Sequence, residues 1–212
     1  MYAKYFKRLI DFCFSLFGLI LLSPLMVVLT VTGAIVMKGN PFFIQKRPGK
    51  KDKNGNEKIF SLIKFRTMTC EKDKDGNLLP DELRLNKYGR FLRATSLDEL
   101  PELVCIMCGY MSLIGPRPLL PKYLDRFTEE QRHRHDVRPG LTGLAQINGR
   151  NALCWEDRFK LDLEYVANVT FLGDLKIFFQ TVLKVLKREG ISSEASATME
   201  EFMGTVDLNG TK

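Results

Sequence analysis

Two adjacent carboxylates, Asp98 and Glu99, are the residues of this sequence best suited to chemistry, because basic residues lie on both sides of them. Arg93 precedes Asp98 by five positions, and Arg117 follows in a Gly-Pro-Arg-Pro turn. Carboxylates bind hard cations, and guanidinium groups bind phosphate oxygens through charge-assisted hydrogen bonds. Residues 92–118 therefore predict a site that handles a phosphate and a metal ion.

The same acids also have a purely structural interpretation. Residues 96–99 match the S-x-x-E capping box, in which Ser96 bonds the backbone amide of Glu99 and Glu99 reaches back. Pro101 complicates this interpretation, because proline favours the first turn of a helix. The helix would then begin at Pro101 and leave both acids in the loop before it. The sequence leaves these two arrangements open.

Two further segments carry residues that suit phosphate or base binding. Residues 58–68 alternate as a half-buried strand does, which places Lys64 and Arg66 on one face. Ordinary surface charge explains these two residues equally well. The stretch from Arg138 to Arg150 is dense in glycine and amides, and such loops expose backbone N–H groups that bind phosphate. A cluster of structural turns would have the same composition.

The composition is that of a folded protein with anionic partners. The chain has 212 residues, 45% of them hydrophobic and 27% charged, and a net charge of +7. Its five cysteines form an odd, scattered set, which indicates a reducing compartment rather than a disulfide framework. Cys105 and Cys108 form a C-x-x-C pair without a second pair, so a redox or zinc role is disfavoured.

The N-terminal part of the chain contains an apolar segment, residues 12–37, long enough to cross a bilayer. Proline within a helix removes a backbone hydrogen bond, so Pro24 predicts a kink, and the Ser23 hydroxyl is a candidate to satisfy the freed group. Basic residues flank both ends and draw both to the cytoplasm; they are Lys4, Lys7, Arg8, Lys38, Lys46 and Arg47. A re-entrant hairpin, broken at Ser23 and Pro24, satisfies both observations.

Two alternatives for this segment remain. A cleavable signal peptide is disfavoured, because the apolar run is too long and no A-x-A site follows it. A buried core helix is the structural alternative, although the run exceeds most core helices in length.

The remaining elements are helices, turns and loops. We expect tight turns at Asn54-Gly55 and Asp75-Gly76, and helices over residues 84–93, 155–168 and 172–188. The last of these is amphipathic and suits either the membrane interface or the core. A second capping box, Thr128-x-x-Gln131, opens a charged helix that carries His133 and His135. These histidines are two positions apart and face different directions, which disfavours a metal role. From residue 189 onward the chain is polar, and we expect it to be loosely ordered.

Four motifs in one order resemble the bacterial monotopic phosphoglycosyl transferases; they are KFRTM (64–68), SLDELPEL (96–103), SLIGPRPL (112–119) and RPGLTGLAQINGR (138–150). The likeness extends over nearly the whole chain, including the Ser-Pro segment and residues 184–190. Within the family, the motifs are most similar to transferases that load diacetylbacillosamine phosphate onto undecaprenyl phosphate for protein glycosylation. The loop over residues 50–58 is longer than in compact members, but it lies outside these motifs.

The resemblance implies a magnesium-dependent enzyme that takes a UDP-sugar and undecaprenyl phosphate and releases UMP. Asp98 would be the nucleophile, and Asp98 and Glu99 would hold Mg²⁺. The expected phosphate-binding residues are Lys64, Arg66, Arg93, Arg117 and Arg138. Gln146 and Asn148 would read the uracil edge through paired donors and acceptors, and Arg150 completes the expected substrate-binding set.

The expected architecture is an α+β, mainly helical fold in three parts. Residues 1–38 would form the re-entrant membrane helix, residues 39–190 a small cytoplasmic catalytic domain with a short strand element and amphipathic interfacial helices, and residues 191–212 a polar tail. The protein would then sit in the bacterial inner membrane on its cytoplasmic face, inserted without spanning it, with downstream glycosyltransferases as possible partners.

Two alternatives concern the function itself. The same reaction with a hexose donor would serve capsule, exopolysaccharide or O-antigen synthesis. A non-enzymatic, membrane-anchored basic module would bind nucleic acid or acidic protein, and it explains the net charge but not the adjacent acids. We therefore expect no nucleic-acid partner.

Overall fold

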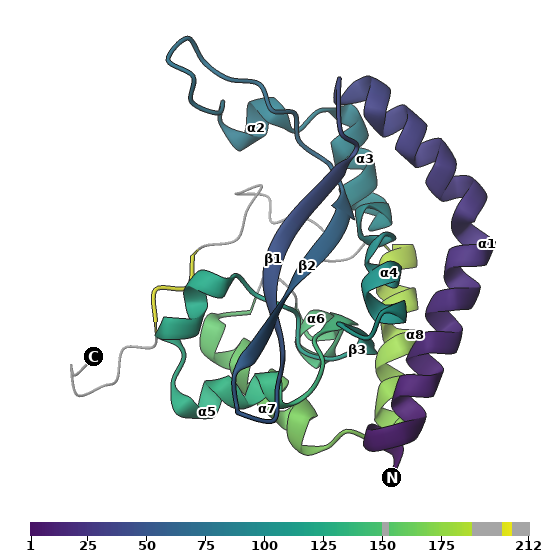
Figure 1. Ribbon diagram of the computed structural model, residues 1–212, viewed down its shortest axis with the longest axis vertical. Coiled ribbons are helices and arrows are strands. Elements are labelled where there is room, and N and C mark those ends of the chain that lie inside the picture. Colours follow the sequence, from purple (N-terminus) through teal and green to yellow (C-terminus); the bar gives the residue numbers. More distant parts are fainter. Residues whose placement is uncertain (150–152, 188–200, 205–212) are drawn as a thin grey trace.

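The computed structural model describes residues 1–149, 153–187 and 201–204 (Figure 1). The fold mixes helices with strands, and helices predominate, as expected, although two of the strands, β1 and β2, are longer than the short strand element that we predicted. In chain order the elements are η1 (Tyr2–Phe6, a π-helical turn), α1 (Lys7–Val36), β1 (Phe42–Lys51), β2 (Glu57–Phe65), α2 (Asp81–Arg84), α3 (Lys87–Thr95), η2 (Leu97–Glu99), α4 (Glu102–Met107), β3 (Ser112–Ile114), η3 (Pro121–Arg126), α5 (Glu129–Arg132), η4 (His133–Asp136), β4 (Gly140–Thr142), α6 (Leu144–Ile147), α7 (Trp155–Ala167) and α8 (Phe171–Lys187), where η2, η3 and η4 are 3-10 turns.

Helix α1 is one continuous helix of 30 residues that contains Pro24. It runs along one side of the molecule and bends on its way to α3 (Figure 1). Proline has no N–H to donate to the carbonyl of Ile20, four positions earlier. The Ser23 hydroxyl donates to this carbonyl at 2.8 Å, as expected from the sequence. The predicted separation into two helices at Ser23 and Pro24 is not seen, because the backbone remains helical through the proline.

Both ends of α1 are fastened to the rest of the protein. Near the N-terminus, Arg8 donates to the carbonyls of Ile106 and Met107 at 2.7 and 2.6 Å and so caps the end of α4. Near the C-terminus, the Tyr88 hydroxyl of α3 donates to the Leu29 carbonyl at 2.8 Å. The outward face between these contacts is apolar and exposed; it includes Phe14, Phe17, Ile20, Leu21, Val27, Val28, Val31 and Ile35. Of the residues described, only those of this segment form a helix long and apolar enough to cross a membrane.

Strands β1 and β2 form a long antiparallel hairpin that crosses the middle of the molecule (Figure 1). The expected turn is present, because Gly55 adopts φ 84 and the Asp52 carboxylate accepts the amides of Asn54 and Asn56 at 2.7 and 3.0 Å. The inner face of β2 packs on α4 in a cluster of apolar residues; its buried members are Phe60, Leu62, Leu103, Cys105, Ile106 and Met111. This packing fixes the position of Lys64 near the end of β2.

A second pair of strands, β3 and β4, is parallel, with Ser112 opposite Gly140 and Ile114 opposite Thr142. The sequence did not indicate this pair, because three residues are too few to show an alternating pattern. A Cβ atom on Gly140 would lie 2.1 Å from the amide nitrogen of Gly115. The glycines of this region therefore permit close backbone packing, which places the Gly-Pro-Arg-Pro turn directly against residues 138–143.

The C-terminal helices support the other side of this centre. Helix α5 begins with the predicted capping box, in which Thr128 and Gln131 form both reciprocal bonds, although the helix ends after one turn at Arg132. Helix α8 buries Asp174 and Ile177 against the core. Its opposite face is exposed and apolar; it includes Leu172, Phe179, Leu183 and Leu186. Both predicted uses of this amphipathic helix are thus compatible with its placement.

Candidate active site

The acid pair lies in the connection between α3 and α4 (Figure 1). Ser96 ends α3 with a left-handed backbone at φ 55, and Leu97–Glu99 form a single 3-10 turn. Helix α4 begins at Glu102 with Pro101 as its N-cap, and Ser96 makes no capping bond through its side chain. The S-x-x-E capping box is therefore wrong, and the alternative, a helix that starts beside Pro101, is confirmed. A non-glycine residue with positive φ is uncommon and occurs often at functional sites.

Glu99 lies between two cations from distant parts of the chain. Lys64 Nζ and Arg117 Nη2 each lie 2.7 Å from the same oxygen, Glu99 Oε1. Burial alone would raise the pKa of Glu99, but the charges of Arg117 and Lys64 outweigh it and lower this pKa below its usual range. Glu99 is consequently ionised at neutral pH. The structure thus brings Lys64 and Arg117, both predicted to bind phosphate, to the acid pair.

Asp98 differs from its neighbour, because no residue within the described ranges donates a hydrogen bond to its carboxylate. Burial, followed by the negative charge of Glu99, raises the pKa of Asp98 to about 6. Lys64, Arg117 and Arg93 oppose this rise, which places all three cations within electrostatic reach of Asp98. A carboxylate with a raised pKa is more basic, and it is better able to attack an electrophile than a paired one.

A third carboxylate, Glu102, joins the cluster and was missed from the sequence. Its side chain is 4% exposed and lies 2.9 Å from Lys64 Nζ. Burial is the main cause that raises the pKa of Glu102 to about 7, and the charge of Glu99 adds to it against the opposing charge of Lys64. The signal was available, because Glu102 follows Glu99 by three positions and so lies one helical turn away.

Two further arginines border the acids. Arg93, one of the predicted residues, donates from Nε to the Thr67 hydroxyl at 3.1 Å. Arg47 of β1 was not predicted as a site residue; it donates to the Pro118 carbonyl at 3.1 Å. Burial and the nearby charge of Arg117 lower the pKa of Arg47 to about 10. Through this hydrogen bond, Arg47 of the β1–β2 hairpin supports the Gly-Pro-Arg-Pro turn.

Two predicted phosphate-binding residues lie elsewhere. Arg66 follows the end of β2 and donates to the Phe42 carbonyl at 3.3 Å, with the Cys70 sulfur at 3.2 Å. Arg138 donates to the Gly109 carbonyl at 2.8 Å, next to the N-terminal part of α1. The structure brings neither guanidinium group to the acid cluster. Lys64 and Arg66 do not share a strand face as predicted, because β2 ends at Phe65 and Arg66 lies beyond it.

The residues predicted to read the nucleotide base have different surroundings. Gln146 is 8% exposed, and neither atom of its amide has a partner within the described part of the chain. A Cβ on Gly143 would lie 2.9 Å from Gln146 Oε1, and Gly143 packs against Gly115 next to the Gly-Pro-Arg-Pro turn. Asn148 is exposed and donates to the Leu144 carbonyl of its own helix at 2.8 Å. Arg150 lies outside the described residues.

The chemistry of the acids fits Mg²⁺ in part. Mg²⁺ takes oxygen ligands and commonly uses one or two carboxylates together with phosphate oxygens and water. Lys64 and Arg117 both contact Oε1 of Glu99, which leaves Oε2 and the unpaired Asp98 carboxylate as donors. Across the described ranges, no group of three or more His, Cys, Asp or Glu residues is arranged to hold a metal. The substrate phosphates would therefore have to supply further ligands.

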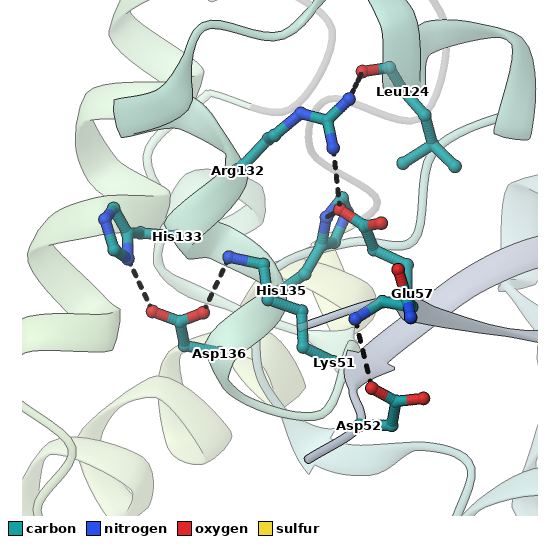
Figure 2. Close-up of polar contacts among 9 residues, drawn as sticks. Lys51, Asp52, Glu57, Leu124, Arg132, His133, His135 and Asp136 are labelled. Carbon is teal, nitrogen blue, oxygen red and sulfur yellow. Dashed lines mark hydrogen bonds and ion pairs between the residues drawn. The ribbon is translucent and has the colours of Figure 1, made fainter. Parts of the chain in front are cut away.

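The two histidines lie near the far end of the hairpin and contact different carboxylates (Figure 2). His133 Nδ1 lies 2.6 Å from Asp136, whereas His135 Nδ1 lies 3.3 Å from Glu57. They therefore point in different directions, as their spacing predicts. Burial is the main cause that lowers the pKa of His135 to about 3, so this ring is neutral at pH 7 and donates from Nδ1. These contacts tie the hairpin to η4.

Comparisons with known proteins show which family this chain is similar to. A model of the bacterial sugar transferase family matches residues 2–188. The chain is 49% identical over 204 residues to the uncharacterized sugar transferase EpsL of Bacillus subtilis, with 96% of this chain and 98% of that protein covered. It is 35% identical to the undecaprenyl-phosphate galactose phosphotransferase of Salmonella typhimurium and 38% identical to the UDP-glucose:undecaprenyl-phosphate glucose-1-phosphate transferase of Klebsiella pneumoniae.

The last two alignments cover 89% and 84% of this chain but 42% and 40% of those proteins. This chain thus spans less than half the length of these two relatives and nearly all of the Bacillus protein. The family match includes every element from α1 to α8, together with the acid cluster between α3 and α4. On these grounds the chain belongs to the bacterial sugar transferase family and is a phosphoglycosyl transferase.

Proposed function

We propose that the protein transfers a sugar 1-phosphate from a UDP-sugar to undecaprenyl phosphate, by way of a covalent intermediate on Asp98. The products are undecaprenyl diphosphate sugar and UMP. The observation that carries the proposal is the unequal state of the two acids: Glu99 is paired with two cations, and Asp98 has a raised pKa and no hydrogen bond among the described residues. A nucleophilic carboxylate needs to be unpaired and basic in this way.

The reaction would proceed in two displacements at phosphorus. In the first, a carboxylate oxygen of Asp98 attacks the sugar-linked phosphorus, and the bond to the bridging oxygen breaks so that UMP leaves with the electron pair. In the second, a phosphate oxygen of undecaprenyl phosphate attacks the acyl phosphate, and the Asp98 carboxylate leaves. Each displacement forms one P–O bond and breaks another, and one anion leaves for each anion that attacks. No oxidant or further reactant is needed.

The cations of the site would offset the repulsion between Asp98 and an anionic diphosphate. Arg117 and Lys64 already stand at Glu99, and Arg93 lies within electrostatic reach of Asp98. Mg²⁺ bound at Asp98 and Glu99 would neutralise phosphate charge and polarise the phosphorus. The orphaned amide of Gln146 is the group that would recognise a polar edge of the donor, since a buried amide without partners is costly unless a ligand satisfies it.

Two classes of donor sugar remain as alternatives. The likeness of the motifs to diacetylbacillosamine phosphate transferases favours an N-acetylated amino sugar. The Salmonella and Klebsiella relatives are named for galactose and glucose phosphate transfer, and a Sinorhizobium fredii relative is named as an exopolysaccharide production protein. These names favour a hexose and exopolysaccharide synthesis. A panel of UDP-sugars, compared by kcat/KM for UMP release, decides between the two classes.

The membrane arrangement that fits best is re-entrant, with the catalytic part on the cytoplasmic face of the bacterial inner membrane. Arg8 and Tyr88 attach opposite ends of α1 to the same catalytic part of the chain. A straight helix of this length would be about 45 Å long, at about 1.5 Å per residue. If this helix spanned the bilayer, its two ends would lie on opposite sides of the membrane. In this structure the catalytic part of the chain contacts both ends of the helix.

The decisive experiment incubates the protein in nanodiscs with a UDP-sugar labelled in its sugar, Mg²⁺ and no lipid acceptor. Protein-bound label at Asp98, released on addition of undecaprenyl phosphate, would support the covalent scheme. UMP release that requires both substrates together, without trapped label, would overturn the intermediate. No UMP release from any UDP-sugar would favour the non-enzymatic binding module instead.

A further inference from the structure

A buried ion pair lies behind the Gly-Pro-Arg-Pro turn, between Arg134 of η4 and Asp162 of α7. Each residue is 2% exposed. Arg134 donates to Asp162 Oδ2 from Nη2 at 2.7 Å and from Nε at 3.1 Å. Its guanidinium group also lies against two aromatic rings, 5.7 Å from the centre of Phe127 and 5.8 Å from that of Phe159. Neither charge takes part in the chemistry proposed above.

Stability alone is a weak reason for such a pair. The cost of removing two charges from water commonly equals or exceeds their attraction, and apolar residues of similar size often serve as well. The pair does have one connection that apolar residues would lack. Arg134 Nη2 also donates to the backbone carbonyl of Arg117 at 2.8 Å.

This contact completes the support of the turn that presents Arg117. The flanking Pro116 and Pro118 restrict the backbone, and two arginines hold consecutive carbonyls: Arg134 that of Arg117, and Arg47 that of Pro118. With its backbone held in this way, the Arg117 side chain reaches Glu99 at 2.7 Å. The carbonyl that Arg134 holds thus belongs to the same residue whose side chain contacts Glu99.

The C-terminal segment Glu201–Gly204 closes the cluster around Arg134, contrary to the expectation of a loosely ordered tail. Phe202 is 1% exposed, and its ring lies 5.0 Å from Phe159 and 5.8 Å from Phe127, the two rings that flank Arg134. It also contacts Tyr123 and Trp155. Arg126 donates to the Phe202 carbonyl, so both the backbone and the ring of this residue are held.

We propose that Arg134 is a positioning residue for Arg117, that Asp162 orients its guanidinium group, and that Phe202 of the C-terminal segment keeps this group enclosed. The inference rests on the proposed role of Arg117 in binding the donor. It gives Glu201–Gly204 a function, because Phe202 of this segment stabilises the wall behind the active site. The position of Arg117 therefore depends on residues remote from the acids in sequence.

The test is a double-mutant cycle on the full-length protein, read as donor kcat/KM for UMP release. Arg134→Lys keeps a cation beside Asp162 but lacks the planar fork that reaches Asp162 and the Arg117 carbonyl together. We expect Arg134→Lys, and separately Phe202→Ala, to lower kcat/KM by about tenfold, mainly through a higher KM, and to change it less than about twofold when Arg117 is already alanine. Equal effects in both backgrounds would overturn the inference.

A second readout does not depend on activity. Hydrogen–deuterium exchange of peptides covering residues 112–120 should be faster in Arg134→Lys and in Phe202→Ala than in the wild type. The matched control is Glu201→Gln, which removes the exposed ion pairs of the same segment with Lys122 and Arg126 and should leave exchange and kinetics unchanged. If the wild type releases no UMP, the proposed function fails, and exchange alone decides the positioning role: unchanged exchange in both variants would refute it.

Discussion

Asp98 and Glu99 are adjacent in the chain, yet Glu99 binds two cations through one oxygen while Asp98 is left without a hydrogen bond from any described residue. The 3-10 turn at Leu97–Glu99 directs the two side chains into different surroundings. Glu99 thereby organises Lys64 and Arg117, and Asp98 retains a basic carboxylate. This division leads to distinct expectations for the two acids.

Replacement of Asp98 by asparagine should abolish turnover and the trapped sugar phosphate while the protein stays folded, because the amide is not an anionic nucleophile. Glu99→Gln should retain trace labelling, since it weakens the pairing with Lys64 and Arg117 but keeps the nucleophile. The readouts are label on the protein and steady-state UMP release. Full turnover by Asp98→Asn would exclude the covalent scheme.

Replacement of Arg117 by alanine should cost roughly 1.5–3 kcal/mol in transition-state binding, the usual range for a hydrogen bond to a charged group. Part of this loss should appear in the donor KM. Arg66→Ala is the matched control, because it makes the same change at a guanidinium group that the structure leaves away from the acids. Equal kinetic losses in both variants would show that Arg66 reaches the substrate after all.

Cysteine labelling in intact cells tests the membrane arrangement. In a background without the native cysteines, Lys4→Cys and Lys38→Cys should both be protected from a membrane-impermeant maleimide and react after permeabilisation. Pro24→Ala restores the backbone donor and should expose part of the Lys4 site to the outside, since a straighter helix favours spanning. Opposite accessibility of the two sites in the parent protein would show a spanning helix.

Acid should destabilise the protein through His135. The pKa of this residue is about 3 in the folded state and about 6.5 when unfolded, so the unfolded chain binds more protons between these values. The contribution of a neutral His135 to the free energy of unfolding is fully present above pH 6.5, and it is lost as the pH drops towards 3. Between pH 7.5 and 5 we expect a loss of about 1–2 kcal/mol from this group.

Thermal unfolding at these two pH values, with His135→Gln beside the parent, measures this contribution. The variant should show a smaller pH dependence than the parent. The control is His133→Gln, whose ring is 62% exposed and paired with Asp136, and which should change the pH dependence little. An identical pH dependence in His135→Gln and the parent would contradict the assignment of a buried neutral ring.

Local patterns in the sequence predicted those parts of the fold that depend on local chemistry. The turn at Gly55, the capping box at Thr128 and the Ser23 hydroxyl bond to Ile20 were all confirmed, because each involves residues within a few positions of one another. Lys64 and Arg117 were predicted to bind phosphate beside the acid pair, and the structure places both at Glu99. Their role in phosphate binding stays a prediction.

Long-range packing determined the rest. The spacing of Glu99 and Glu102 could have indicated that the two acids lie close together, but only the packing of β2 against α4 brings Lys64 to both of them. Arg138 was predicted to bind phosphate, but it donates to the Gly109 carbonyl, near Arg8 and Asp11 of α1. Phe202 is a single aromatic residue in a polar tail, and no periodicity marks it as buried. Such contacts join segments that are distant in the sequence, and no local pattern in one segment predicts its contact with the other.

The attachment of both ends of α1 has a consequence for how the protein responds to lipids. A spanning helix must match its apolar length to the bilayer, and mismatch tilts it or sorts it among membranes of different thickness. In α1, Arg8 and Tyr88 set the separation of the two ends through contacts with the folded catalytic part. In the proposed re-entrant arrangement, insertion depth would be a property of the folded protein, and bilayer thickness would have little influence on the distance between the acids and the lipid phosphates.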